Sequence, residues 1–423
     1  MTIRHSTLAR TFLLAAVVAG GHAVALRSAL VVSRDMVTGD GSSSQLRPGF
    51  RYPLLRLPSN ASTARYDAEN RLGGDFAQIY FPAREFAAGT AYSEQTPDPW
   101  GRESRYPPFV HWACAVTICT LPYGQASLLH MAVQYAVFVL SFVYAFYALQ
   151  LARYLPLALL FVNVGLFLTP VGLSWFERGQ FSLYVAAAYL WLLLGVYRTN
   201  AVFLAVAALL AYAKWTSFPM LFVVLGIWLL VSPDRASLVR RARAVTAPVA
   251  TIAGLFLLFP EQGMQFLSGV VSQESAFTPE GLSLSRVFPR LLVKLLPFGL
   301  VALGAYWMRR QKIEQLLPVV LGAAVLLLLY PTWAYDYSVP CLFGLIPFVL
   351  DWSRQVSVQN RLVAWAVPAI FLLFLTAASA LKISDTLAAI DTDLWMIWVY
   401  IAVSAILLAA PLFRPAPQAD GHI

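Results

Sequence analysis

Asp75 is the residue whose type and sequence position best suit a catalytic role. It follows two glycines and precedes an aromatic-rich run in the stretch RLGGDFAQIYFPAREFAAGTAYS, residues 71–93. A carboxylate held beside a reacting hydroxyl acts as a general base. Asp is equally a favoured helix N-cap, which stabilises a helix by about 1 kcal/mol without any chemistry. The sequence leaves both roles open, and one residue can fill both.

Three basic residues are candidates for binding an anionic group: Lys214, Arg178 and Arg105. Lys214 lies in the apolar stretch LLAYAKWTSFPMLF, where a charge is costly and either marks function or extends its ammonium to the interface. Arg178 follows Glu177, so an ion pair between these two is the alternative. For Arg105, the alternative is a structural role in its loop.

Three further residues have side chains suited to binding a ligand. Gln180 opens an apolar stretch, where its amide forms hydrogen bonds to a ligand or else caps a helix. Asp336, in the stretch YPTWAYDYSVP, accepts hydrogen bonds from ligand hydroxyls or pairs with a cation. Trp333 stacks on a ligand ring or joins the aromatic belt that membrane proteins place at the interface.

Other chemistries have little support in the sequence. Cys114, Cys119 and Cys341 lie in apolar segments without metal-ligand spacing, so we expect small buried side chains and no disulfide framework. The histidines are scattered, and no pair has ligand spacing on one helix face. No Walker loop or dinucleotide fingerprint occurs. We therefore predict neither a bound metal nor a cofactor.

The composition indicates a membrane protein. Of 423 residues, 59% are hydrophobic and 12% are charged, whereas about a quarter of the residues in soluble domains are charged. Apolar runs of about 20 residues recur, as crossing about 30 Å of hydrocarbon requires. We expect one all-α polytopic domain over residues 1–423, with about twelve transmembrane helices. Membrane orientation and anionic lipid explain the net charge of +9 better than nucleic acid does.

The predicted spans have ends uncertain by several residues. The short apolar stretch 109–122 ends in proline, so we treat it as a re-entrant or interfacial helix that does not cross. The first apolar run ends in HAVA, which also suits a signal cleavage site, although an uncleaved helix is favoured. The spans are 9–31, 124–150, 155–175, 180–197, 200–215, 218–231, 245–260, 291–308, 315–331, 338–350, 362–381 and 394–412.

Basic residues set the orientation, because Lys and Arg in short loops lie on the cytoplasmic side. With the N-terminus inside, the inner segments hold 14 of the 30 basic residues and 4 of the 21 acidic residues. Two long segments then face outside, 33–108 and 261–290. Within the first, residues 75–87 have apolar side chains at helical spacing, and we predict a helix along the membrane surface with Asp75 as its N-cap.

The order of these motifs resembles the GT-C superfamily, specifically glycosyltransferase family 87, the polyprenol-phosphate-mannose-dependent mannosyltransferases. The family's first outer loop runs Asp-Phe, Tyr, Gly-x-x-Pro-Tyr and Tyr-Pro-Pro. Ala91 stands where the family has proline. The stretches RGQFSLYVAAAYLWLLLGVYR (178–198) and AYAKWTSFP (211–219) resemble later family motifs, and the likeness covers roughly 65–350. The matching residues in the loop are Asp75, Phe76, Tyr80, Gly89, Tyr92, Tyr106, Pro107 and Pro108.

The resemblance implies a hexosyltransferase of the inner membrane, with its site on the outer face and membrane lipids around it. A hexose, mannose or a relative, passes from a polyprenyl-phosphate donor to a lipid or glycan hydroxyl by direct displacement with inversion. One carboxylate suffices, because a lipid phosphate leaves readily as an anion. Asp75 is then the base, Lys214, Arg178 and Arg105 bind the phosphate, and the substrate contacts are Tyr80, Tyr106, Gln180, Trp333, Asp336 and Tyr337.

One departure and two alternatives remain. The family has a histidine after the acid of its later outer loop, whereas Tyr337 follows Asp336 here. Either Tyr337 performs the role of that histidine, or the role is absent. A transporter or flippase is the alternative class, although we find no internal repeat and the charges lie at helix ends. An enzyme of another sugar-lipid class would depend on Arg286, Arg290 and Lys294 in the second outer loop.

Overall fold

The computed structural model describes residues 75–92, 104, 106–168, 175, 179–214, 217–230, 232, 234–275, 283–310, 316–330, 335–355 and 392–409. These residues form thirteen α-helices and no strand, which confirms the all-α prediction. The helices are α2 (Ala77–Arg84), α3 (Pro108–Ala115), α4 (Tyr123–Ala148), α5 (Leu155–Leu168), α7 (Ser182–Arg198), α8 (Ala201–Tyr212), α9 (Phe218–Leu230), α10 (Arg235–Leu257), α11 (Pro260–Ser275), α12 (Arg290–Arg310), α13 (Leu316–Leu327), α14 (Tyr335–Gln355) and α16 (Thr392–Ala409).

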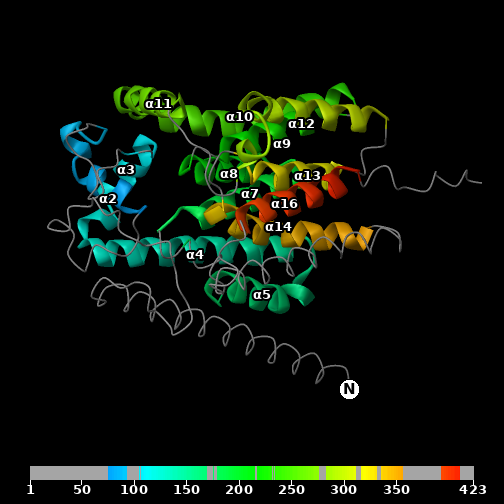
Figure 1. The fold of residues 1–423 in the computed structure, drawn as a ribbon, viewed down its shortest axis with the longest axis horizontal. Coiled ribbons are helices and arrows are strands. Elements are labelled where there is room, and N and C mark those ends of the chain that lie inside the picture. The colour runs from blue at the N-terminus through cyan, green and yellow to red at the C-terminus, as the bar shows by residue number, and fades with distance from the viewer. Residues whose placement is uncertain are drawn as a thin grey trace, which may run out of the picture.

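Helix α7 lies at the centre of the bundle and packs against α4, α8 and α14 (Figure 1). Helix α8 also packs against α10, α9 against α12, and α13 against α16. A short turn joins α7 to α8: Thr199 adopts a left-handed conformation, and the Asn200 side chain caps α8 by accepting from the backbone N–H groups of Val202 and Phe203. The turn makes α7 and α8 antiparallel neighbours.

The helix ends gather in two groups at opposite ends of the bundle. In one group, Arg198 donates to the carbonyl of Ala148, and Arg354 donates to that of Gln150, so the C-terminal ends of α4, α7 and α14 meet. In the other group, α2 and α3 lie beside the N-terminal end of α4 (Figure 1). The C-terminal ends of α4, α7 and α14 therefore lie at one end of the bundle, and α2 and α3 lie at the other.

Two hydrophobic cores hold the chain together. The larger core joins α4, α5, α7, α8, α9, α13, α14 and α16. The smaller core lies under α2 and α3 and includes Phe76, Tyr80, Tyr106, Tyr123 and Phe181. The smaller core therefore attaches the segment of Asp75 to the starts of α4 and α7.

Helix α3 and its continuation correct one sequence prediction. Helix α3 has eight residues and a 3-10 turn, η6, follows at Ile118–Thr120, so this stretch is too short to cross hydrocarbon, as predicted. The prediction of no disulfide was wrong, because Cys114 and Cys119 are bonded. The break between α3 and η6 turns the chain back, which brings the two Cα atoms to 5.0 Å. Cys341 is a buried free thiol, as expected.

Helices α10 and α11 differ from the predicted boundaries. The helix that contains most of the predicted span 245–260 begins earlier, since α10 starts at Arg235, where Asp234 caps it by accepting from the N–H of Ser237. Arginine and alanine are strong helix formers, so charge did not make this segment a loop. Much of the loop predicted at 261–290 is α11, which turns from α10 by 99°.

Length and apolarity alone qualify one described helix, Tyr123–Ala148, as a membrane span, or two if the bent pair α10 and α11 counts as one span. The twelve-helix arrangement thus stays a prediction. Helices α7, α8, α9, α13 and α16 confirm helical structure at predicted spans but are shorter or more interrupted than the apolar runs. The spans 9–31 and 362–381 and most of the outer loop 33–108 lie outside the described residues.

Helix α13 packs closely on α16 at Gly322, which yields a stability prediction. A Cβ at Gly322 would lie 3.0 Å from the backbone nitrogen of Leu408 and from the carbonyl oxygen of Ser404. We expect Gly322→Ala to destabilise the protein by about 1–3 kcal/mol, because backbone must shift. Thermal unfolding of the purified protein measures the effect. Gly254→Ala in α10 is the control, since nothing lies within 4 Å there; equal melting temperatures for both variants would contradict the prediction.

Candidate functional site

Asp75 lies just before α2, with its carboxylate turned into the protein. The prediction that Asp75 is the N-cap was wrong: the N-cap is Phe76, whose side chain offers no oxygen. The carboxylate accepts a hydrogen bond from the side-chain amide of Gln180. Asp75 is 5% exposed and Gln180 is 1% exposed. The start of α2 and the start of α7 therefore meet through a buried carboxylate and a buried amide.

Helix α2 is buried on most sides, which corrects the predicted surface helix. Phe76, Ile79 and Tyr80 are buried as the apolar stripe predicted, but Gln78 is also buried and Ala87 is exposed. Helix α3 packs along α2. Apolar spacing predicted which side of the helix is buried, but it held no information about the segments that cover the rest.

Lys214 follows α8 and is also buried, at 7% exposure. Its ammonium donates to the hydroxyl of Tyr106 at 3.2 Å and lies 4.5 Å from the centre of that ring. The cation is therefore held on a phenol face, a contact that desolvation strengthens. The alternative in which Lys214 extends to solvent does not describe this side chain.

Tyr106 joins the acid and the cation into one cluster. Its ring lies 5.1 Å from that of Phe181, the residue after Gln180. Its backbone carbonyl accepts from the hydroxyl of Tyr92 at 2.7 Å, and burial raises the pKa of Tyr92, so this donor keeps its proton. Contacts therefore run from Asp75 through Gln180, Phe181 and Tyr106 to Lys214. We call these five residues the acid–lysine cluster.

Tyr80 lies beside the acid–lysine cluster, but its hydroxyl has structural partners. It donates to the carbonyl of Leu121 at 2.9 Å and accepts from Arg84 at 3.1 Å. The bond to Leu121 ties α2 to the turn after η6, and the bond from Arg84 lies within α2. Tyr80 is therefore positioned as a support of α2.

Sequence reasoning missed a polar pair on α4 that supports the cluster. His130 is buried and stacks on Phe76, with ring centres 4.7 Å apart, and also contacts Phe181 at 4.6 Å. Gln134, one turn later, lies 3.3 Å from His130 and accepts from the backbone N–H of Leu183 in α7. Two polar residues four positions apart in an apolar helix are the signal that points to them.

Three candidates, Arg178, Arg105 and Trp333, lie outside the described residues. Asp336 and Tyr337 lie in the first turn of α14, and their side chains are also outside the described part. Within that part, no group of three or more His, Cys, Asp and Glu side chains is arranged to hold a metal. The cluster as described offers one carboxylate, one amide, one phenol and one ammonium.

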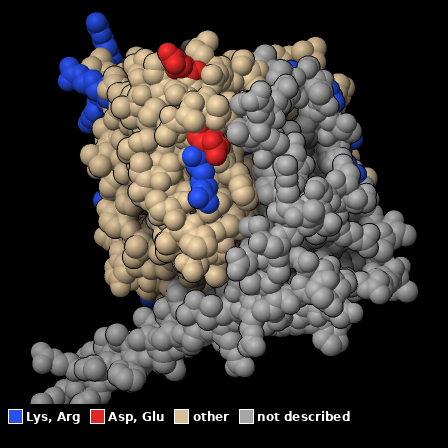
Figure 2. Space-filling model, turned by 90° about the vertical axis from the view of Figure 1, so that its left-hand side faces the viewer, with Lys and Arg blue, Asp and Glu red and all other residues tan. Residues whose placement is uncertain are grey.

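Comparison of the chain with protein-family models, curated proteins and solved structures gives no match. Inferences about the site therefore come from its own geometry. Figure 2 views the end of the molecule that carries α2, α3 and α11: its described surface is mostly uncharged, with an acidic side chain beside a basic one near the centre and basic side chains at the upper left edge. The charges of the acid–lysine cluster lie beneath this surface, because Asp75 and Lys214 are both buried.

His111 makes stability depend on pH. It is fully buried in α3 and contacts the carbonyl of Ile79, and burial lowers its pKa to about 4. The unfolded chain, with a pKa of about 6.5, binds the proton first, so stability falls as the pH drops from about 6.5 towards 4. The loss is about 3 kcal/mol at most. Thermal unfolding between pH 7 and 4.5 measures it, and His111→Gln should flatten the curve; an unchanged slope would contradict the assignment.

The disulfide predicts local stability around α2. Cys119 lies two residues before Leu121, whose carbonyl anchors Tyr80. Replacing both cysteines by serine should cost about 2 kcal/mol, because the closed loop is short, and the loss should concentrate in α2 and α3. Amide hydrogen exchange tests this, with residues 131–148 of α4 as the internal control. Uniform or unchanged protection in the serine variant would argue against it.

Proposed function

We propose that the protein is a membrane glycosyltransferase of the GT-C type, resembling glycosyltransferase family 87. It transfers a hexose, mannose or a relative, from a polyprenyl-phosphate donor to a hydroxyl of a lipid or glycan. The observation that carries the proposal is the acid–lysine cluster: Asp75 and Lys214, 139 positions apart in the sequence, reach one buried cluster through Gln180 and Tyr106. A base and a phosphate-binding cation are the two groups that this reaction needs.

Each group in the cluster has a step to perform. Asp75 accepts the proton of the acceptor hydroxyl as its oxygen attacks the anomeric carbon of the sugar. The bond from that carbon to the phosphate oxygen breaks, and the polyprenyl phosphate leaves with the bonding electrons. Lys214 stabilises the negative charge that develops on the departing oxygen. Attack opposite the leaving group inverts the anomeric centre.

The cluster as described is closed, so the proposal includes a rearrangement. The Gln180 amide occupies the carboxylate of Asp75, and both residues are buried. An acceptor hydroxyl reaches the carboxylate only when the Gln180 amide moves away, or when the amide shifts enough for the sugar to bind beside it. In the proposal, a movement at the start of α7 or α2 separates the Gln180 amide from the Asp75 carboxylate, since these two segments bring the two groups together.

The proposed membrane arrangement has about twelve helices, with the cluster at the outer face of the inner membrane. The gathering of α2, α3 and the start of α7 at one end of the bundle supports a common side for these segments. The Cys114–Cys119 disulfide supports an outer location, because disulfides persist in oxidising compartments. The basic segment at the start of α10 lies at the other end, as the inner side of this arrangement requires.

Transfer assays on point variants test the proposal. Purified protein is incubated with a panel of polyprenyl-phosphate sugars and acceptors, and products are read by mass spectrometry. We expect Asp75→Asn to lower the rate by 10²–10⁴-fold, as loss of a general base does. Lys214→Gln should also lower the rate. Glu85→Gln is the matched control, because Glu85 is an exposed acid at the end of α2 and should retain the rate.

The same experiment separates the alternatives. Thermal unfolding shows whether each variant is folded before its rate is compared. Loss of transfer in Arg286→Ala but not in Asp75→Asn would move the site to the second outer segment. Consumption of no donor, with movement of a substrate across a bilayer containing the protein, would replace the transferase proposal by transport.

A further inference from the structure

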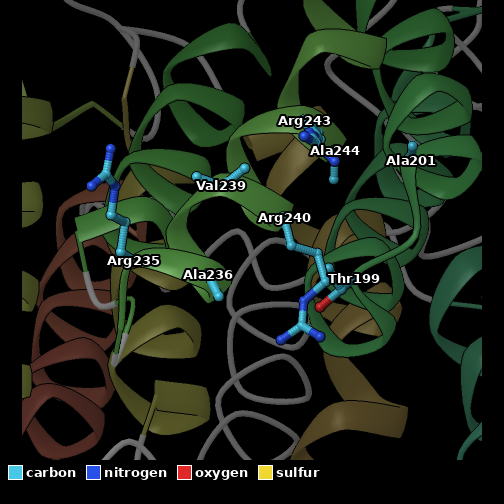
Figure 3. Close-up of a pocket in the computed structure, with 8 residues that line it drawn as sticks. All are labelled: Thr199, Ala201, Arg235, Ala236, Val239, Arg240, Arg243 and Ala244. Carbon is cyan, nitrogen blue, oxygen red and sulfur yellow. The ribbon is translucent and has the colours of Figure 1, made fainter.

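A pocket of about 810 Å³ lies between the turn that joins α7 to α8 and the first turns of α10 (Figure 3). Thr199 and Ala201 come from the turn and the start of α8. The remaining lining residues come from α10: Arg235, Ala236, Val239, Arg240, Arg243 and Ala244. The acid–lysine cluster lies at the other end of α7 and α8, since Gln180 precedes α7 and Lys214 follows α8. The pocket is therefore a separate site.

The lining residues of α10 follow the spacing of one helix face. Counted from Ala236, the positions are i, i+3, i+4, i+7 and i+8, which lie along a single stripe. Ala236, Val239 and Ala244 on this stripe are small or apolar, whereas Arg240 and Arg243 on the same stripe carry charge. Figure 3 shows Ala236 and Val239 between Arg235 and Arg240, with Arg240 directed towards Thr199. The pocket thus combines an apolar floor with a basic rim.

The charge of the rim is strongly positive. Arg235, Arg240 and Arg243 are exposed, and the nearby acid, Asp234, is engaged in capping α10 through Ser237. Arg241, in the same segment, lies elsewhere: it donates to the carbonyl of Trp228 at 2.6 Å and covers the ring of that residue. Three of the four arginines in this segment therefore line the pocket.

We propose that this pocket binds the headgroup of an anionic phospholipid. Guanidinium groups bind phosphate through paired hydrogen bonds, and the hydroxyl of Thr199 adds a further donor. The apolar floor formed by Ala236, Val239 and Ala244 takes the hydrocarbon next to the headgroup. The volume falls in the range of small-molecule sites, about 300–1,000 Å³. A pocket for a free phosphate ion would need the basic rim but no apolar floor.

The inference rests on the proposed membrane location and is independent of the transfer reaction. In that arrangement the pocket faces the cytoplasmic leaflet, where anionic lipids attract basic segments and basic pockets between helices bind lipid headgroups. A bound lipid would contact α8 and α10 together, because both line the pocket.

Lipid binding to the full-length protein in detergent tests the proposal, read by native mass spectrometry. The probes are phosphatidylglycerol, phosphatidylcholine and soluble glycerol phosphate. We expect the protein to retain phosphatidylglycerol in preference to the other two. Arg240→Gln with Arg243→Gln should weaken this binding at least tenfold, and Val239→Trp should weaken it without changing any charge, because the indole fills the pocket floor.

Two controls decide the outcome. Arg153→Gln with Arg354→Gln removes two exposed arginines near the C-terminal ends of α4 and α14 and should leave binding within about twofold. Equal losses in both double variants, or full binding in Val239→Trp, would overturn the proposal in favour of general attraction to a basic surface. Equal retention of glycerol phosphate would overturn the lipid assignment. Asp75→Asn should bind phosphatidylglycerol normally, so failure of transfer and failure of lipid binding are distinguishable.

Discussion

The burial of one carboxylate and one ammonium in the same small core is the constraint on which the rest of this structure depends. Ionised groups are expensive to remove from water unless hydrogen bonds and opposite charges replace their hydration. Asp75 accepts a hydrogen bond from the amide of Gln180, and Lys214 donates one to the hydroxyl of Tyr106 and lies over the face of that ring. Asp75, Gln180, Tyr106 and Lys214 come from four separate segments, so both charges depend on contacts between parts of the chain that are distant in sequence.

Much of the surrounding architecture holds these partners in place. His130 and Gln134 of α4 support Phe76 and the start of α7, and the disulfide secures the turn to which Tyr80 donates. Their effect is to hold α2 against α4 and α7, which keeps the segments of Asp75 and Gln180 next to each other.

Some of this was predictable because certain residues are conspicuous in an apolar chain. Lys214 is a lone charge in a long apolar run, and Asp75 follows two glycines, so both were found from sequence. The disulfide was missed because its closeness depends on the break between α3 and η6, which spacing does not reveal. The burial of α2 was missed for a related reason, since the covering segments are distant in sequence. The helical structure at the start of α10 was not predicted, because the segment 232–245 was used only for its charge, to orient the spans.

The α7–α8 hairpin links the two charged ends of the molecule. Gln180 precedes α7 and Lys214 follows α8, whereas Thr199, at the turn between them, lines the arginine-rimmed pocket. The 17 residues of α7 rise about 25 Å, close to the hydrocarbon thickness of about 30 Å. In the proposed membrane arrangement, one rigid hairpin therefore carries a polar cluster to each interface. The turn at Thr199 and Asn200 marks one end of the hairpin, and the acid–lysine cluster lies at the other. The length of the hairpin thus fixes the depth of this cluster relative to the polyprenyl-phosphate donor on which it is proposed to act.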